Sequence, residues 1–428
     1  MMIASPFKTL KLLKHFLIYI NMSRKKIITS EYVSYAHPDK LADRISDALL
    51  DCYIQCDADT RAGIETMVKD NVVVLGGEVN SCSMIDVDRV VRLTVDGIYP
   101  ENHHLSGKEL KIINLIGKQS SEISKGVDKC DTDVIGAGDQ GFVVGFASNE
   151  TKEYLPLGVY LAREICNGVT MLDKFSDKYI GPDVKTQVCV EYGGRRPRVK
   201  SIVVSAMHSD KITVEEVRKA IEDMIKTNRT DIFAVMDDEI YLEFIKDKDI
   251  EYYINVNGAW TIGGPIADCG LTGRKIVVDQ YGGYCNVGGG CFSGKDMTKV
   301  DRSGAYMARY IAKNIVDAGL ADSAKVEISY IISDPNPCAL KVELQNPIDT
   351  KLNDLSSQIE KYIKENIDLT PSGIIDRFFP EGVRPIFENT ARNGHFGFNY
   401  SNGFWPWEKM DFSDDLKEYI VKSELELK

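Results

Sequence analysis

The hydrophobic residues of this chain follow two spacings, one typical of helices and one typical of strands. Between residues 30 and 55 a loop leads into a segment where Leu41, Ile45 and Leu49 recur every four residues, which predicts an amphipathic helix. Pro38 and Asp39 are favourable residues for its first turn. Comparable patterns predict helices at residues 83–98, 213–226, 301–319 and 353–367, the second with a capping box at Thr213 and Glu216 and the third opened by Asp301 and closed by Gly319.

Alternating or short continuous apolar runs predict the strands. Residues 63–79 have the pattern of a hairpin that turns at residues 69–71. Residues 188–192 and 199–204 predict a second hairpin, and further strands are expected at residues 25–30, 141–151, 275–279, 325–333 and 338–345. Helices and strands therefore alternate along the 428 residues, which indicates a mixed α/β or α+β protein of two or three domains.

Composition and charge narrow the possible functions. With 43% hydrophobic and 27% charged residues, the chain has an ordinary globular composition. Its net charge of −12 argues against a nucleic-acid surface and against an anionic membrane as partner, because both require excess Lys and Arg. The ten cysteines contain no C-x-x-C pair, which favours reduced thiols in a cytoplasmic protein.

The N-terminal residues 1–21 are basic and apolar, but their sequence does not predict a membrane span. Their longest apolar run, residues 16–20, is too short for a signal-peptide core, and a span needs about 20 apolar residues. We interpret residues 1–21 as a non-core extension and Met22 as a candidate true start.

Two short motifs could bind phosphate, and each also has a simpler interpretation. HPDK (residues 37–40) lies at a predicted helix start, where free N–H groups and the helix dipole favour anions and Asp39 could hold Mg²⁺. Alternatively, Asp39 only caps the helix and His37 is a surface residue. GAGDQG (residues 136–141) surrounds Asp139 with glycines that allow close approach to a ligand. Alternatively, it is a tight turn in which Asp139 bonds its own backbone.

Residues 263–306 are the most informative stretch, because they combine many glycines with cations and carboxylates. Cations beside exposed backbone amides suit a polyphosphate, and carboxylates among them would let Mg²⁺ bridge protein and phosphate. The alternative is an ordinary glycine-rich loop with scattered charges. Gly289, Gly294 and Lys295 even match the spacing of a phosphate loop. However, Asp296 replaces the required Ser or Thr, and residues 282–290 separate the preceding strand from the loop. A phosphate loop is therefore excluded.

Four motifs in fixed order, HPDK, GAGDQG, GGPIADCGLTGRK and GGGCFSGKD, resemble those of the S-adenosylmethionine synthetase (methionine adenosyltransferase) family, bacterial type. The resemblance extends from about residue 27 to residue 407. It implies three similar α+β domains with pseudo-threefold symmetry. We expect an N-terminal domain at residues 22–122, a mobile-loop connector at 123–135, a central domain at 136–262 and a C-terminal domain at 263–428, each of which can be discontinuous in space. Residues 117–133 match the family's mobile loop that gates the active site.

The resemblance also implies an activity. Methionine sulfur would attack C5′ of ATP, and the released triphosphate would be hydrolysed to pyrophosphate and phosphate. A thioether is already a competent nucleophile, so the site needs fixed cations for the leaving group rather than a nucleophile–base pair. The family uses two Mg²⁺ per site and K⁺, and it builds each site between two subunits, so we expect a homodimer at minimum and a homotetramer in the full assembly.

Residue roles transfer motif by motif. The resemblance implies ATP contacts at His37, Asp183, Val184, Lys185, Ala259, Trp260, Asp268, Arg274, Lys275, Cys291 and Lys295. It implies methionine contacts at Glu78, Gln119, Asp268, Lys299 and Ile332, Mg²⁺ ligands at Asp39 and Asp301, and a K⁺ ligand at Glu65. Catalysis would depend on His37, Asp139, Lys185, Arg274 and Lys295, and Phe292 and Ile332 would help to wall the adenosine pocket.

Several positions depart from the family pattern. Tyr35-Ala36 stands where many members carry Glu-Gly, Cys291 where Ala is common, and Ala259 where bacterial relatives often have Arg. Residues 284–287 replace a more basic connector. The principal charged positions are present, so the expected reaction is unchanged. Two alternatives remain, a Mg²⁺-dependent kinase, which would release ADP, and a nucleotide-binding protein without catalysis.

Overall fold

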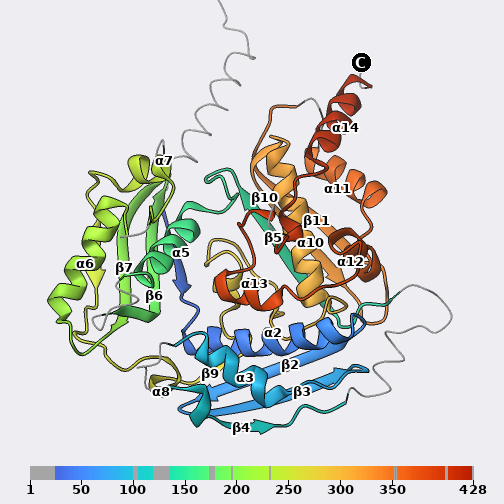
Figure 1. The fold of residues 1–428 in the computed structure, drawn as a ribbon. Coiled ribbons are helices and arrows are strands. Elements are labelled where there is room, and N and C mark those ends of the chain that lie inside the picture. Colours follow the sequence, from blue (N-terminus) through green and yellow to red (C-terminus); the bar gives the residue numbers. More distant parts are fainter. Residues whose placement is uncertain are drawn as a thin grey trace, which may run out of the picture.

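The computed structural model describes residues 25–99, 105–118, 135–172, 179–193, 196–230, 233–350, 352, 354–400 and 403–426 (Figure 1). The predicted N-terminal extension, Met22, Gln119 and nearly all of the predicted mobile loop lie outside these residues.

The elements agree with a mixed α+β protein. The strands are β1 (Lys26–Val33), β2 (Arg61–Lys69), β3 (Val72–Asn80), β4 (Lys111–Asn114), β5 (Gly141–Ser148), β6 (Ile180–Tyr192), β7 (Arg198–His208), β8 (Glu251–Ile254), β9 (Gly270–Leu271), β10 (Ala321–Tyr330) and β11 (Ala339–Pro347). The helices are α2 (Pro38–Cys56), α3 (Val87–Asp96), α5 (Leu157–Val169), α6 (Val214–Thr227), α7 (Asp238–Ile240), α8 (Gly264–Ala267), α9 (Ile276–Asp279), α10 (Val300–Asp317), α11 (Leu355–Asn366), α12 (Pro371–Phe378), α13 (Phe387–Asn393) and α14 (Ser413–Leu425).

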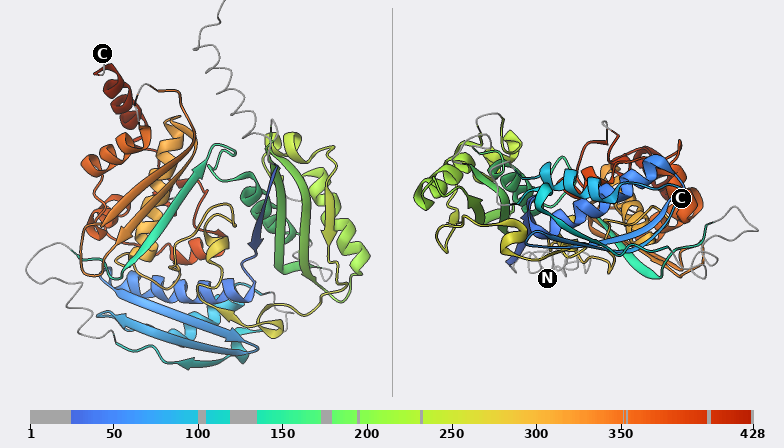
Figure 2. Two further views of the ribbon diagram at one scale, coloured as in Figure 1. Left: turned by 180° about the vertical axis from the view of Figure 1, so that it is seen from behind. Right: turned by 60° about the horizontal axis from the view of Figure 1, so that its bottom comes forward.

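Three sheets of similar design form the framework (Figures 1 and 2). Their strand orders are β4-β3-β2-β9, β1-β6-β7-β8 and β11-β10-β5. Each sheet includes a strand from a distant part of the sequence, since β9 pairs with β2, β1 with β6, and β5 with β10, all antiparallel. The three sheet-and-helix units are therefore not contiguous segments of chain.

One long helix packs on each sheet: α2 on β2, α5 on β1 and β6, and α10 on β5 and β10. The alternation of buried and exposed side chains along β2 illustrates how a helix packs on one face of a sheet. Ile64, Thr66 and Val68 are buried on one face, whereas Glu65 and Met67 are exposed on the other. In Figure 1, α13 lies between the three units, and it packs against α2.

Most predicted elements are confirmed, and two details are wrong. The hairpin turning at residues 69–71 and the capping box of α6 are both present. The predicted strand at 275–279 is instead the single helical turn α9, because a short apolar run fits a strand and a buried helical turn equally well. Asp301 lies in the first turn of α10 but does not cap it, since the N-cap is Lys299.

Candidate active site

The start of α2 brings the first group of predicted site residues together. The carboxylate of Asp39 is almost fully buried and accepts the Leu271 backbone N–H at 3.0 Å. It also pairs with Lys275 at 2.5 Å and with the Arg274 Nε at 2.8 Å. Asp39 therefore does not serve only as a helix cap, and that alternative is wrong. Two cations that the sequence places 235 and 236 residues away meet on one carboxylate.

His37 is the N-cap of α2, and its ring is neutral. Its Nδ1 accepts the Asp39 backbone N–H at 3.2 Å, which assigns the ring proton to Nε2. Burial and the neighbouring Lys275 lower the pKa of His37 to about 4. Lys185 and Asp268 are close enough to influence the same ring. His37 thus offers an N–H donor to an oxygen atom at neutral pH.

Lys185 reaches this group from the neighbouring sheet. It lies on β6 beside Val33 of β1, and its ammonium pairs with Glu31 at 3.0 Å. The Lys185 side chain is exposed, and that of Glu31 is partly buried. Lys185 can exchange this weak, solvent-screened partner for an anionic ligand at little cost.

A second group forms around the start of α10. Lys295 makes an ion pair with Asp301, and Cys291, Asp139 and Glu65 are near enough to affect the charges there. Burial would lower the pKa of Lys295, but its anionic neighbours outweigh burial and raise it, so the side chain is charged. No hydrogen bond or ion pair joins this group to the Asp39 group in the described part of the chain.

Four aspartates spaced four residues apart on α2 fix the backbone that carries both groups. Asp39 accepts the Leu271 N–H, Asp43 the Gly273 N–H at 2.8 Å, and Asp47 the Gly294 N–H at 2.8 Å. Asp51 accepts the N–H groups of Phe387 and Glu388 at 3.0 and 2.9 Å. Because residues at i and i+4 share a helix face, one stripe anchors the chain directly before Arg274 and directly before Lys295. Asp43, Asp47 and Asp51 were not among the predicted site residues, although their four-residue spacing is visible in the sequence.

Asp296, the residue that disagreed with a phosphate loop, is a structural carboxylate. It is buried and accepts the Ala62 N–H at 2.8 Å and the Thr298 N–H at 2.9 Å. It also pairs with Lys299 at 3.1 Å. Asp296 therefore holds the loop after Lys295 against β2. Its carboxylate binds groups of the protein itself, which indicates a structural role rather than ligand binding.

For Asp139, Asp183 and Val184, the contacts in the structure are with the protein itself and do not test the predicted roles in ligand binding. Asp139 accepts the Gln140 N–H at 2.7 Å, which agrees with the backbone bond of the simpler interpretation of GAGDQG. The backbone there is a bend rather than a hydrogen-bonded turn, and Asp139 also lies near Lys295. Asp183 is buried and accepts the Gly264 N–H at 2.7 Å, and burial raises its pKa to about 7. Val184 is buried, with its backbone bonded to Ser34.

The remaining positions stay predictions. Trp260 donates its ring N–H to Ile262, Phe292 is buried, and Ala259, Glu78 and Ile332 are exposed. Glu78 lies on β3 opposite Gly63, and Gly63 also bridges to Lys295. Gln119 is outside the described residues.

Comparison with known proteins shows to which family this chain belongs. Models of the N-terminal, central and C-terminal domains of S-adenosylmethionine synthetase match residues 25–121, 134–260 and 262–409. The chain belongs to the S-adenosylmethionine synthetase family. A solved structure, that of an unusual S-adenosylmethionine synthetase from Campylobacter jejuni, is similar with 33% identity and a TM-score of 0.80, covering 92% of this chain and 99% of that one.

Membership in the S-adenosylmethionine synthetase family supports synthesis of S-adenosylmethionine as the general activity, and it confirms the predicted α+β fold of three domains. Among the helices that the structure describes, none has the length and apolar character needed to cross a bilayer.

Proposed function

We propose that this S-adenosylmethionine synthetase joins ATP and L-methionine by attack of the methionine sulfur on C5′ of ATP. The triphosphate leaves whole and is then hydrolysed to pyrophosphate and phosphate. The observation that supports this best is the pairing of Arg274 and Lys275 with Asp39, and of Lys295 with Asp301. Such cations are arranged for a highly charged leaving group.

The electrostatics of these pairs suit triphosphate departure. Negative charge grows on the leaving oxygen in the transition state, and fixed cations in a partly dry site stabilise it more than water would. Lys185 and the Nε2–H of neutral His37 lie beside Arg274 and Lys275 and add donors for the same oxygens. The methionine sulfur needs no base, because it attacks as a neutral nucleophile.

The donor set fits magnesium. Among the described residues no group of three or more His, Cys, Asp and Glu side chains could hold a metal alone. Mg²⁺ commonly binds through one or two carboxylates, with water and substrate phosphates completing the shell. Asp39 and Asp301 each present a carboxylate beside phosphate-binding cations, so we propose them as the two Mg²⁺ ligands. Bound Mg²⁺ would neutralise phosphate charge. Glu65 is the proposed K⁺ ligand, on the exposed face of β2.

The residues toward methionine and adenosine remain part of the proposal. Glu78, Gln119, Lys299 and Ile332 would position methionine, Asp268 would contact both substrates, and Asp139 would face the reacting centre. Asp183, Val184, Ala259, Trp260 and Cys291 would contact ATP, and Phe292 and Ile332 would help to wall the adenosine pocket. We propose that two subunits complete each site, within a dimer or tetramer.

Product analysis tests this proposal. The full chain is incubated with ATP, L-methionine, Mg²⁺ and K⁺, and mass spectrometry follows S-adenosylmethionine while phosphate and pyrophosphate are measured separately. Equal amounts of all three products are expected. ADP as the nucleotide product, or turnover of ATP without any sulfonium, would contradict the proposal and favour a kinase or another ATPase.

A further inference from the structure

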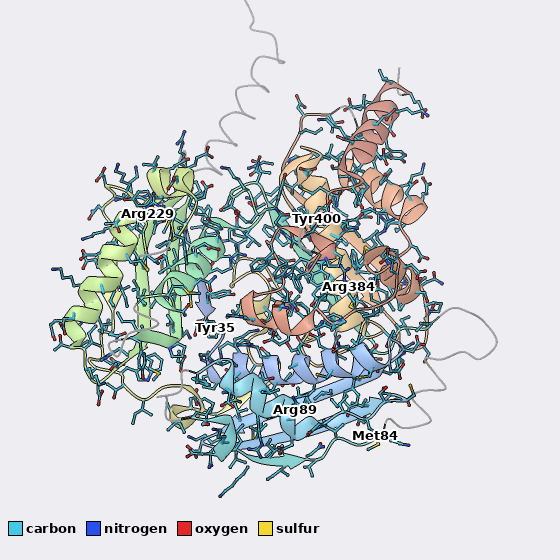
Figure 3. The ribbon with its side chains drawn as sticks, in the orientation of Figure 1. Tyr35, Met84, Arg89, Arg229, Arg384 and Tyr400 are labelled. Carbon is cyan, nitrogen blue, oxygen red and sulfur yellow. The ribbon has the colours of Figure 1, made fainter. Side chains whose placement is uncertain are left out.

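A cavity of about 320 Å³ lies behind the HPDK motif, between the ends of α3 and α5, the start of β6, and α13. Its wall includes Tyr35, Ile98, Tyr99, Tyr179, Pro182 and Arg392. In Figure 3, Tyr35 lies beside α13 and above the start of α2. We propose that this cavity binds a small, flat anion, of the class of aromatic or heteroaromatic carboxylates.

The walls suit a flat apolar body. Tyr35 and Tyr99 are almost fully buried, and both line the cavity together with Tyr179. Ile98 and Pro182 add aliphatic surface. Small-molecule sites commonly have this character, with apolar and aromatic walls and few polar groups. Aromatic side chains favour offset or edge contacts with a second ring, so a planar ligand gains more here than a flexible chain.

The charge at the cavity selects an anion. The Arg392 guanidinium lies 5.3 Å from the centre of the Tyr35 ring, and the Arg44 guanidinium lies 5.9 Å from the same ring. Arg44 is bound to Glu388, whereas no carboxylate of the described residues pairs with Arg392. Asp183, next to Pro182 of the wall, is near enough to act on Tyr99, but burial raises its pKa to about 7. Two guanidinium groups therefore still exceed the charge of Glu388 and a partly protonated Asp183. A guanidinium matches a carboxylate with two parallel hydrogen bonds.

Tyr35 is the residue that leaves Arg392 available. A carboxylate at position 35 would lie between the two guanidinium groups and neutralise the excess charge. Tyr35 supplies a ring instead, so a carboxylate on a ligand can take that place.

The cavity shares its wall with the proposed ATP site. The Tyr99 hydroxyl donates to the Ala36 carbonyl at 2.7 Å, directly before His37. It also packs on Gly264, where an added Cβ would lie 2.7 Å from the hydroxyl, and Gly264 binds Asp183. A ligand against Tyr99 should therefore alter KM for ATP. This coupling rests on the proposed function, whereas binding to the cavity does not.

Calorimetry with two matched probes tests the binding. The full chain is titrated with 2-naphthoate and with 2-naphthamide, which has nearly the same shape but no charge. We expect 2-naphthoate to bind at least about tenfold tighter than 2-naphthamide, because the amide lacks the charged hydrogen bond to Arg392. Arg392→Met and Tyr35→Glu should reduce naphthoate affinity to that of the amide, and Tyr35→Phe should retain it. Thermal melts verify that each variant is folded.

Equal affinity of the two probes, or full naphthoate affinity in Arg392→Met, would overturn the proposal. Displacement of naphthoate by ATP in simple competition would also overturn it, because the probe would then occupy the nucleotide site. KM for ATP, measured with and without naphthoate, reports the coupling separately. If naphthoate binds but KM for ATP does not change, the proposed coupling to the ATP site is wrong, whereas the proposed binding site in the cavity is still supported. S-adenosylmethionine formation without probe tests the proposed function independently.

Discussion

In the proposed mechanism, single charged residues contribute both to the protein without ligand and to substrate binding, and the ion pair of Lys295 and Asp301 is an example. Within the chain each neutralises the other, so the half-buried lysine stays charged without an anionic ligand. With substrate present, the lysine would turn to phosphate and the carboxylate to Mg²⁺. The pair Lys275 and Asp39 has the same design. The ion pairs thus keep cations in place at modest energetic cost until a stronger anion arrives.

Lys295→Met tests this reasoning at one residue. The change removes a cation from the leaving group, so kcat should fall by about 10²–10³-fold, the usual effect of losing one such donor. Steady-state kinetics with ATP and methionine measure it, and Lys295→Arg should recover part of the rate. Lys226→Met, which removes an exposed lysine paired with Glu222, is the matched control and should keep full activity. Near-normal kcat in Lys295→Met would refute the role of Lys295.

At the scale of the element, α2 is the scaffold of the site. Its four aspartates bind backbone N–H groups of three separate segments, at Leu271 and Gly273, at Gly294, and at Phe387 and Glu388. Asp47 also binds Arg302 through two hydrogen bonds of 2.7 and 2.9 Å, and both side chains are fully buried. Positions far apart in sequence are therefore held relative to one helix.

Asp47→Asn should be strongly destabilising. The amide cannot balance the charge of Arg302, and breaking a buried pair by changing one partner costs about 3–5 kcal/mol. Denaturant or thermal unfolding measures the loss. Asp88→Asn is the control, because Asp88 pairs with Arg92 on the exposed surface of α3 and should change stability little. Equal effects of the two substitutions would contradict the assigned role of Asp47.

Asp51 predicts a pH dependence of stability. Burial raises the pKa of Asp51 to about 7, above its value in the unfolded chain, so the folded state binds the proton more tightly. The contribution of this tighter proton binding to the free energy of unfolding is complete below pH 4 and is lost as the pH rises to 7. Its size is about 1.4 kcal/mol for each unit by which the folded and unfolded pKa values differ. Asp51→Asn does not titrate there. The melting temperature of the wild type should therefore fall relative to that of Asp51→Asn between pH 5 and 7.5. A constant difference would show that Asp51 does not titrate in this range.

The sequence predicted elements better than it predicted contacts. Local signals such as the capping box at Thr213 and the turn at residues 69–71 depend on neighbouring residues and were read correctly. The segment at 275–279 was misread, because its conformation is decided by tertiary contacts of Lys275 and Asp279 with Asp39 and Lys40. The motifs named the charged site residues, but the ion pairs, the neutral state of His37 and the aspartate stripe required the fold.

At the scale of the whole molecule, each of the three sheets has exposed side chains among the described residues. On β2, Glu65 and Met67 lie opposite the face that packs on α2. Ile113 on β4 and Leu271 on β9 are exposed in the same sheet, as are Ile27 on β1 and Phe142 on β5 in the other two. Exposed apolar side chains on all three sheets support association with a second subunit. The Lys295 group borders the same region, since Lys295 bridges to Gly63 of β2.

Subunit mixing tests whether the two charged groups belong to different sites. Asp39 and Asp47, which anchor the Lys275 and Lys295 groups, are eight residues apart on α2, a separation of about 12 Å along the axis. We predict that the Lys275 group of one subunit works with the Lys295 group of its partner. Lys275→Met and Lys295→Met should each be nearly inactive alone. When the two variants are co-expressed, mixed dimers contain one site with both changes and one intact site, which restores about a quarter of wild-type sites on statistical pairing. Dimer mass is verified by light scattering. If both groups served one site within a chain, every site would stay defective, and mixing would restore no activity.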